Sequence, residues 1–286
     1  MKIISRWRHV VILGITAILF AICVSAYAQE AKVSRIGVLV PGPAWYEIID
    51  GLRSGLKDLG VHEGKQFSLT IRDWNGDIKQ AETAARNLEQ EKFDLIYATS
   101  TNSTLAAKRA TSDIPVVFCA GTDPVVVGLV ESFAKPGGRL TGVYNPTTDL
   151  TAKRMEILKE IVPKLHRVMT FYDPSKPPAI ESSKSAREAA RMLGVELVER
   201  HISSVAELRA SVRALRPGEV DAYFTVSDPM ANNEAQTIID AAKDKRFATM
   251  FDVTSHVIKG GLASYNVSYY EMGRLSAKYV DRKSVV

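Results

Sequence analysis

The segments "FDLIYATS" (residues 93–100) and "VDAYFTVS" (residues 220–227) share an Asp in second place, an apolar and aromatic run, and a final Ser. Upstream of each, a helical pattern ends in Leu-Gly-Val, at 56–61 and 190–195, where the Gly fits the left-handed residue that closes a helix. Downstream of each come another helical pattern and another apolar run, "IPVVFCAGTD" in one case and "FATMFDVTS" in the other. This repeat predicts two similar βα halves within one chain.

Apolar runs alternate with amphipathic helical patterns along the whole chain. The runs predicted to be strands span 33–40, 67–74, 93–99, 114–120, 166–172, 195–201, 220–226, 247–253 and 261–267. The main helical patterns span 46–59, 78–90, 150–161, 182–193, 205–215 and 233–243. Such alternation favours parallel sheets covered by helices on both faces. We therefore predict an α/β fold of two similar three-layer lobes with mainly parallel sheets.

The boundary between the lobes is predicted in "TGVYNPTTD", residues 141–149, where a short strand gives way to Asn145, Pro146 and a helix cap. The N-terminal lobe is expected to span 29–145 and to be joined by 264–286. The C-terminal lobe is expected to span 146–263. Ligands of open parallel sheets bind outside the carboxyl ends of the strands, so a ligand cleft between the lobes is expected.

The loop that follows residues 93–98 is the first candidate for that cleft. It places six residues with hydroxyl or amide groups in a row, which are Thr99, Ser100, Thr101, Asn102, Ser103 and Thr104. The triplet Asn102–Thr104 matches a glycosylation site, but such triplets often arise by chance. A phosphate-binding loop would need glycines and a Lys at a fixed spacing, which this loop lacks. The loop is predicted to lead into a helix whose first turn holds Ser103 or Thr104 and attracts a carboxylate. An ordinary helix cap is the alternative.

Acidic residues supply candidate partners for a ligand ammonium. Four of them each end a predicted strand: Asp123, Asp173, Asp228 and Asp252. Asp228 is favoured because it follows Ser227, the repeat partner of Ser100, and Asp228→Ala is expected to weaken binding without unfolding the protein. Asp before Pro also opens turns, and Asp caps helices, so each of the four alone could be structural.

Aromatic and catalytic candidates are fewer. Trp45 and Tyr46, after the rigid "PGP", could form an aromatic wall or simply pack on the sheet. The histidines beyond the leader show no metal-ligand spacing, and no G-x-S-x-G or G-x-G-x-x-G motif occurs, so no catalysis, metal or cofactor is expected. A pair of cleft Asp residues could hydrolyse a glycoside, but nothing else in the sequence favours it.

The first 28 residues have the three parts of a secretory signal peptide: a basic start, an apolar run from Val10 to Ala26, and small residues at Ala26 and Ala28. Cleavage after Ala28 and a periplasmic location are expected, with an uncleaved anchor or a lipid anchor at Cys23 as alternatives. Losing three basic residues leaves 34 Lys and Arg against 32 Asp and Glu, so no nucleic-acid partner is expected. Cys119 would be the one remaining cysteine.

Long stretches of the chain resemble one known family. They are "RIGVLVPG", "DLIYATSTNSTLAAKRAT", "IPVVFCAGTDPVVVGLVESFAKPGGRLTGV", "VSDPMANN" and "KGGLASYNVSYYEMGRLSAKYV". The chain is similar to periplasmic substrate-binding components of ABC importers, of the uncharacterised or tryptophan/tyrosine type. The resemblance implies a type I periplasmic-binding-protein fold, closure on a ligand, and docking to an ABC permease with its ATPase. Family members with known ligands take aromatic amino acids.

The same resemblance implies a set of cleft contacts. They would fall on Ser100 to Thr104, Thr122, Asp123, Tyr172, Asp173, Ser227 and Asp228. Family members usually continue past "AKYVDR" with a linker and a final strand and helix, whereas this sequence stops at "KSVV". A missing or incomplete third crossover between the lobes is therefore expected.

Together these features predict a monomeric periplasmic solute receptor without catalysis of its own. Its ligand is expected to be an amino acid, with an aromatic one favoured by the resemblance. A ligand-sensing receptor for signalling would share the fold and the cleft. An exported α/β hydrolase would need a nucleophile and a base that the sequence does not reveal.

Overall fold

The computed structural model describes residues 33–284, and from Ser34 onward they belong to one structural unit. The predicted signal peptide and its cleavage after Ala28 lie outside the described residues. Nothing in the described part is a helix long and apolar enough to cross a membrane.

The first sheet contains five parallel strands in the order β2-β1-β3-β4-β5. The strands are β1 (Ser34–Val40), β2 (Phe67–Asp73), β3 (Leu95–Ala98), β4 (Val116–Ala120) and β5 (Leu140–Tyr144). Because all run the same way, the loops after β1, β3, β4 and β5 emerge at one edge. That edge carries the polar loop at Thr99 to Thr104.

The second sheet repeats this topology. Its strands are β6 (Arg167–Tyr172), β7 (Glu196–His201), β8 (Ala222–Phe224), β9 (Ala248–Phe251) and β10 (Ala263–Ser264). The order β7-β6-β8-β9-β10, again parallel throughout, matches the first sheet strand for strand. The predicted α/β fold with two similar sheets is confirmed.

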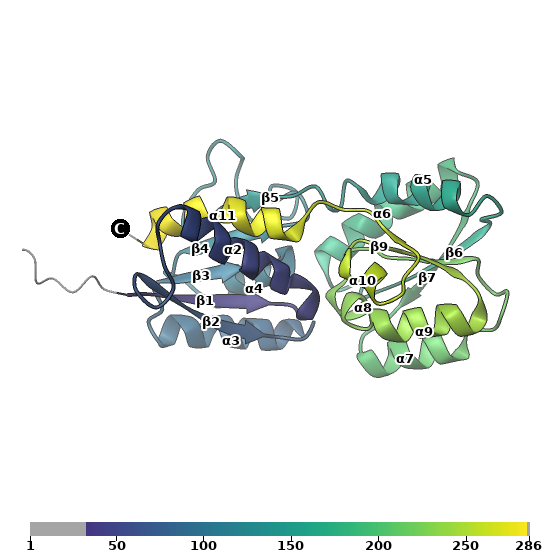
Figure 1. Cartoon of the computed structure of the whole chain (residues 1–286), viewed down its shortest axis with the longest axis horizontal. Coiled ribbons are helices and arrows are strands. Elements are labelled where there is room, and N and C mark those ends of the chain that lie inside the picture. The colour runs from purple at the N-terminus through teal and green to yellow at the C-terminus, as the bar shows by residue number, and fades with distance from the viewer. Residues whose placement is uncertain (1–32, 285–286) are drawn as a thin grey trace, which may run out of the picture. The chain divides into compact units, whose positions relative to one another are not determined.

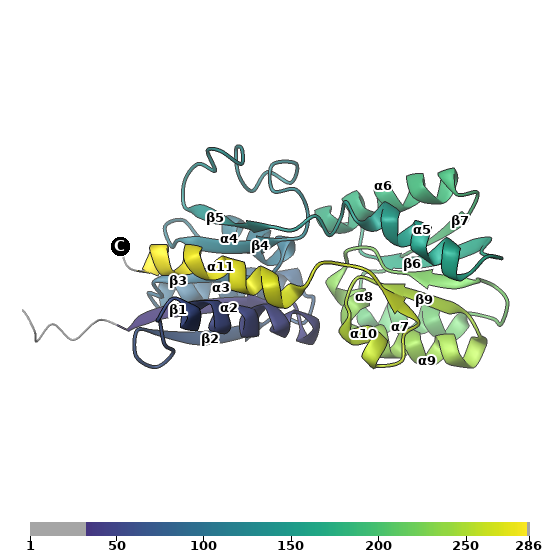
Figure 2. The same ribbon diagram turned by 45° about the horizontal axis from the view of Figure 1, so that its top comes forward.

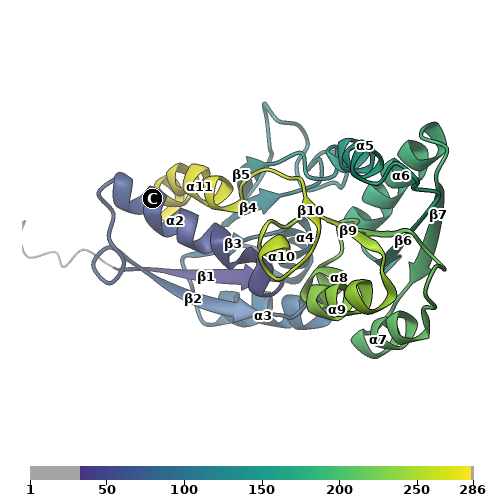
Figure 3. The same ribbon diagram turned by 45° about the vertical axis from the view of Figure 1, so that its right-hand side comes forward.

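Helices cover both faces of each sheet (Figure 1). Around the first sheet lie η1 (Pro43–Trp45), α2 (Tyr46–Asp58), α3 (Ile78–Gln90), α4 (Thr101–Ala110) and α11 (Tyr269–Ser284). Around the second lie α5 (Thr151–Ile161), α6 (Pro177–Met192), α7 (Val205–Ala214), α8 (Pro229–Asn233), α9 (Ala235–Lys245) and α10 (Ser255–Ile258). Figure 3 shows α8 and α9 together beside the second sheet, away from α5 and α6.

Alternation along the strands divides each core into two layers. In β1, Ile36 and Val38 pack towards α2 and α11, whereas Leu39 packs towards α3 and α4. In the second sheet, Phe171 faces the α7–α9 side and Val168 faces the α5–α6 side. The inner strands β1, β3, β4, β8 and β9 are almost entirely buried, which explains why they appear as continuous apolar runs in the sequence. The edge strands β2 and β7 are partly exposed.

Helix α11 lies directly against α2, a packing that is visible in Figure 2. Glycines make this close approach possible: a Cβ on Gly51 would meet the Tyr270 carbonyl, and one on Gly273 would meet the Ile48 carbonyl. The last described helix of the chain is thereby joined to the first sheet, next to the loop that follows β1.

Several element boundaries differ from the predictions. Helix α6 begins at Pro177 rather than Ser182, because consecutive prolines are favoured in a first helical turn. The predicted helix 233–243 is α9, shifted by two residues, and the short α8, which Asp228 and Pro229 start, precedes it as a separate helix. The predicted strand 261–267 is reduced to the two residues of β10. Helix α4 begins at Thr101, so Ser103 and Thr104 lie in its first turn as predicted.

Candidate functional site

A pocket lies where loops from the carboxyl ends of strands in both sheets meet α4, α6, α8 and α11. Its lining residues are Trp45, Ile48, Thr99, Ser100, Thr101, Asn102, Cys119, Gly121, Thr122, Asn145, Thr147, Pro178, Ser227, Pro229, Asn232, Asp252, Tyr269 and Met272. The sequence-predicted candidates among them are Trp45, Ser100, Thr101, Asn102, Thr122, Ser227 and Asp252.

The start of α4 forms one polar wall. Ser100 is the N-cap, and its Oγ accepts a 3.0 Å hydrogen bond from the Ser103 N–H. The Thr101 Oγ1 accepts from the backbone N–H groups of Gly121 and Thr122 at 3.0 and 3.2 Å, which joins this helix to the loop after β4. Ser100, Thr101 and Asn102 line the pocket, and the start of a helix favours a bound carboxylate.

Ser103 and Thr104 have structural contacts instead. The Ser103 Oγ accepts a hydrogen bond from the indole nitrogen of Trp74 at 3.1 Å, and the Thr104 Oγ1 donates to the Ser100 carbonyl at 2.7 Å. Both side chains are fully buried, and neither residue lines the pocket. Of the six consecutive polar residues, the first four line the pocket and the last two hold the helix start in place.

Oxygen atoms form a second polar wall, contributed by the loops after β8 and β9 and by α8. Ser227 Oγ, Asn232 Oδ1 and Asp252 Oδ1 are buried, and none has a hydrogen-bond partner among residues 33–284. Buried polar atoms are rarely left unpaired in folded proteins. An ammonium group has three donors and no acceptor, so it matches a group of oxygens that includes a carboxylate.

The Asp252 carboxyl is almost fully buried. Burial raises its pKa above the ordinary value, while the Arg154 charge and a hydrogen bond from Asn232 act in the opposite direction. The Asp228 carboxylate raises the pKa further because like charges repel. A ligand cation bonded to Asp252 would relieve the cost of this buried charge.

Apolar and aromatic side chains complete the pocket. Trp45 from η1 and Tyr269 from α11 stack with ring centres 6.3 Å apart and planes at 22°. Ile48 on α2, Met272 on α11 and Cys119 near the end of β4 also line the pocket. Trp45 is thus both part of the core and part of the pocket wall. This portion of the pocket suits a flat hydrophobic group.

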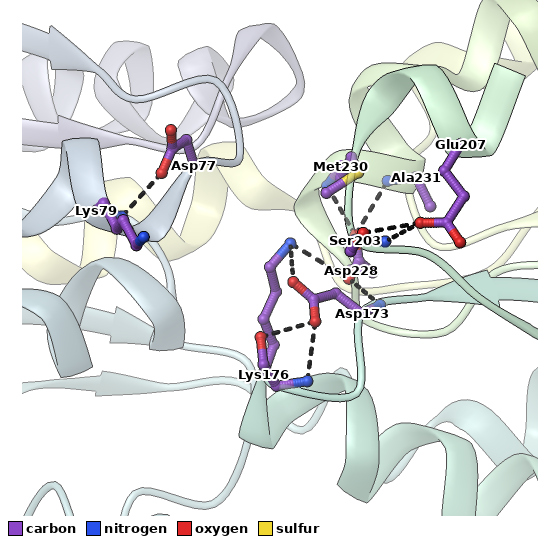
Figure 4. A network of polar contacts seen from close by, with 10 residues as sticks. Asp77, Lys79, Asp173, Lys176, Ser203, Glu207, Asp228, Met230 and Ala231 are labelled. Atoms are coloured by element: carbon purple, nitrogen blue, oxygen red, sulfur yellow. Dashed lines mark hydrogen bonds and ion pairs between the residues drawn. The ribbon is translucent and has the colours of Figure 1, made fainter.

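Asp228, the acidic residue favoured from sequence, is tied up in the fold (Figure 4). Its Oδ1 caps α8 by accepting from Met230 N at 2.8 Å and Ala231 N at 3.1 Å. Its Oδ2 accepts from the Asp173 N–H at 2.9 Å and pairs with the Lys176 ammonium at 3.5 Å. Asp228 is fully buried and does not line the pocket, so its carboxylate holds the loops after β6 and β8 together.

The other candidates outside the lining also have local partners. Asp173 Oδ1 accepts from Ser175 N at 2.9 Å, and Asp123 Oδ1 accepts from Val125 N at 2.8 Å. The Tyr172 hydroxyl donates to Glu199 at 2.5 Å and lies 2.9 Å from the His201 ring nitrogen. These contacts belong to turns and to the β6–β7 pair.

Sequence reasoning missed a group of lining residues that includes Asn145, Thr147, Tyr269 and Met272. All four lie in or next to the segments where the chain passes from one sheet to the other. The predicted boundary at 141–149 and the final crossover were thus signals that could have identified them. No group of metal-ligating side chains occurs among the described residues.

The topology and the pocket define a class of protein: an α/β binding protein with two parallel sheets and a polar, aromatic-lined ligand pocket. A family model described as ABC transporter substrate binding protein matches residues 33–283, and the chain belongs to this family.

Individual relatives agree with this membership. A tyrosine-binding protein of Clostridioides difficile strain R20291 is 29% identical over 265 residues, covering 90% of this chain and 75% of that protein. A conserved domain protein of Vibrio cholerae has a similar structure, with a TM-score of 0.79 and 28% identity over 88% of this chain and 84% of that one. A Streptococcus pneumoniae ABC domain, solved in complex with L-Trp, has a TM-score of 0.78 at 24% identity, again over 88% and 84% of the two chains.

Proposed function

We propose that this protein is the solute-binding component of an ABC importer and that its ligand is an aromatic amino acid. The observation that carries the proposal is the three-part pocket: a helix start, a set of unpaired oxygens around Asp252, and the Trp45–Tyr269 wall. The tyrosine-binding relative supports the same ligand class. Its relatives are binding proteins, and we propose no catalysis by this chain.

The groups of an amino acid match the pocket in one orientation. The ammonium is placed on the Asp252 carboxylate, with Ser227 and Asn232 as further acceptors. The carboxylate is placed at the start of α4, near Thr101, Asn102 and Thr122. The side chain then lies against Trp45 and Tyr269, where ring stacking adds to burial of apolar area.

Isothermal titration calorimetry with ligands that each lack one group tests this assignment. L-tyrosine, L-tryptophan and L-phenylalanine are expected to bind, whereas L-alanine binds at least about a hundredfold more weakly because it buries no ring. Tyramine lacks the carboxylate and 3-(4-hydroxyphenyl)propionate lacks the amine, and each is expected to lose at least about tenfold. Equal binding of tyrosine and alanine, or turnover of any of these ligands, would contradict the proposal.

Delivery to a permease requires an exported protein. We propose a periplasmic, monomeric protein cleaved after Ala28, with lobes at 29–145 plus 264–286 and at 146–263. Mass spectrometry of the protein recovered from a periplasmic extract is expected to find Gln29 at the N-terminus. Growth of an amino-acid auxotroph on low tyrosine, with and without the protein and its permease, tests import directly.

A further inference from the structure

Arg154 is a buried cation without a bonded anion. It lies on α5 with no exposed surface, and no carboxylate within residues 33–284 forms an ion pair with it. Its Nη1 donates to the Thr147 carbonyl at 3.1 Å and its Nη2 to the Thr151 hydroxyl at 2.9 Å. Its Nε has no partner in the described structure. A buried charge of this kind is costly unless an opposite charge compensates it.

We assign the compensating charge to Asp252, because Arg154 lies directly behind the pocket wall: its Nη1 bonds the carbonyl of Thr147, which lines the pocket together with Asp252. Burial lowers the pKa of Arg154, and the charge of Asp252 acts against that lowering. Asp252 lines the pocket and has an unpaired oxygen, whereas Arg154 is not part of the lining. The two charges attract across a buried, poorly screened region without a hydrogen bond between them. Arg154 therefore acts on the pocket through Asp252 and not by touching the ligand.

Other elements place further groups around Asp252. Asp228 before α8 contributes a second negative charge, and Tyr223 of β8 and Tyr269 of α11 contribute neutral phenols. His256 on α10 is uncharged near neutral pH, because burial lowers its pKa to about 4. Asn232 on α8 donates a hydrogen bond to the carboxyl. Arg154 is the positively charged residue that acts on the Asp252 carboxyl.

We infer that Arg154 is a positioning and specificity-determining residue that keeps Asp252 ionised in the empty pocket, so that the pocket selects ligands with a free amine. The inference rests on the proposed function only in taking an amino acid as the ligand. An ionised Asp252 pairs with an ammonium, and a ligand with a neutral group in that place leaves the carboxylate unpaired. With Asp252 protonated, the pocket would no longer distinguish ligands that have an ammonium group from ligands that have a neutral group in its place.

The first test needs no ligand. Titration of the Asp252 side-chain carboxyl by carbon-13 NMR is compared in the wild type, Arg154→Gln and Arg154→Lys. Arg154→Gln keeps a donor but removes the charge, so the titration midpoint is expected to rise by at least about one pH unit, equivalent to a tenfold change. Arg154→Lys, which keeps the charge, is expected to stay near the wild type. An unchanged midpoint in a folded Arg154→Gln would overturn the inference.

The second test is a double-mutant cycle with L-tyrosine as the probe, measured by calorimetry at pH 5 and pH 8. In the wild-type background Arg154→Gln is expected to weaken binding by at least about tenfold at pH 5, where it promotes protonation of Asp252. In the Asp252→Asn background the same change is expected to cost less than about twofold. Equal losses in both backgrounds and at both pH values would mean that Arg154 is only structural.

The two tests separate the inference from the proposed function. If the wild type binds no aromatic amino acid, the proposed function fails, and the NMR midpoint alone decides the role of Arg154. Should Arg154→Gln not fold, Arg154→Lys replaces it: a midpoint and affinity near wild type support the inference. Loss of affinity in Arg154→Lys at a wild-type midpoint overturns it.

Discussion

Two acidic residues of the second sheet show how hydrogen bonds decide the role of a side chain. Asp228 uses both carboxylate oxygens within the fold, on α8, on the Asp173 N–H and on Lys176. Asp252 keeps one oxygen unpaired and lines the pocket. The difference could not be read from the sequence, where each follows a strand and Asp228 has the more familiar Asp-Pro setting.

Asp228→Ala is expected to lower the free energy of unfolding by about 3 kcal/mol, because it leaves the Lys176 ammonium short of a partner and removes the cap of α8. Urea denaturation measures the loss. Asp244→Ala, at an exposed position on α9, is the control and should cost less than about 0.5 kcal/mol. A loss as small as that of the control would remove the structural role assigned to Asp228.

His256 predicts a pH dependence of stability. Its ring is buried against Phe251, neither ring nitrogen has a partner in the described structure, and its pKa is lowered to about 4. The unfolded state, with an ordinary pKa of about 6.5, binds more protons between these values. Stability should therefore fall by up to about 3 kcal/mol as the pH drops from 6.5 to 4.

Urea denaturation over that pH range is the measurement, with His256→Leu as the test variant and exposed His166→Leu as the control. The pH slope should flatten in His256→Leu and persist in His166→Leu. Identical slopes in all three proteins would show that the acid sensitivity arises from other groups.

At the scale of elements, the contact of α2 with α11 is set by glycines on both helices. Their absent side chains let the backbones approach, so that Tyr269 and Met272 at the start of α11 reach the pocket. The packing of this helix therefore affects both stability and the ligand site.

Gly273→Ala is expected to destabilise the protein by about 1–3 kcal/mol, since the added Cβ overlaps the Ile48 carbonyl and forces the helices apart. Leu275→Ala, on the exposed face of α11, is the matched control. Thermal unfolding compares the two, and tyrosine affinity should fall only in Gly273→Ala. A Gly273→Ala protein as stable as wild type would show that the helices can adjust at no cost.

Strands and most helices could be predicted because burial on both faces leaves continuous apolar runs, and helix faces repeat at a fixed period. The separate helix α8 and the shortness of β10 could not, since they depend on capping by Asp228 and on pairing with β9. Likewise Ser100, Thr101 and Asn102 were found from a local polar cluster, whereas Ser103 has its side chain on Trp74, 29 residues away.

At the scale of the whole molecule, one pocket is lined by loops from two sheets of the same topology. A ligand bound there contacts elements from both, and binding energy is shared between them. Because the ligand binds only the folded protein, it raises the free energy of unfolding of the whole unit by mass action.

Hydrogen exchange measured by mass spectrometry tests this linkage. With saturating L-tyrosine, amides at the start of α4 and in α8 are both expected to exchange at least about tenfold more slowly, whereas β7, remote from the lining, should change little. Protection confined to one sheet would mean that the ligand is held by that sheet alone.

The stack of Trp45 on Tyr269 has a practical consequence. Tryptophan emission responds to the polarity and to the aromatic neighbours of the indole, and after the leader this sequence has only Trp45 and Trp74. Trp74 is buried away from the pocket lining, with its indole nitrogen on Ser103. The fluorescence of Trp45 should therefore change when a ligand enters the pocket. In a Trp74→Phe protein Trp45 would be the only tryptophan after the leader, so its emission alone would report binding of any solute that the pocket accepts.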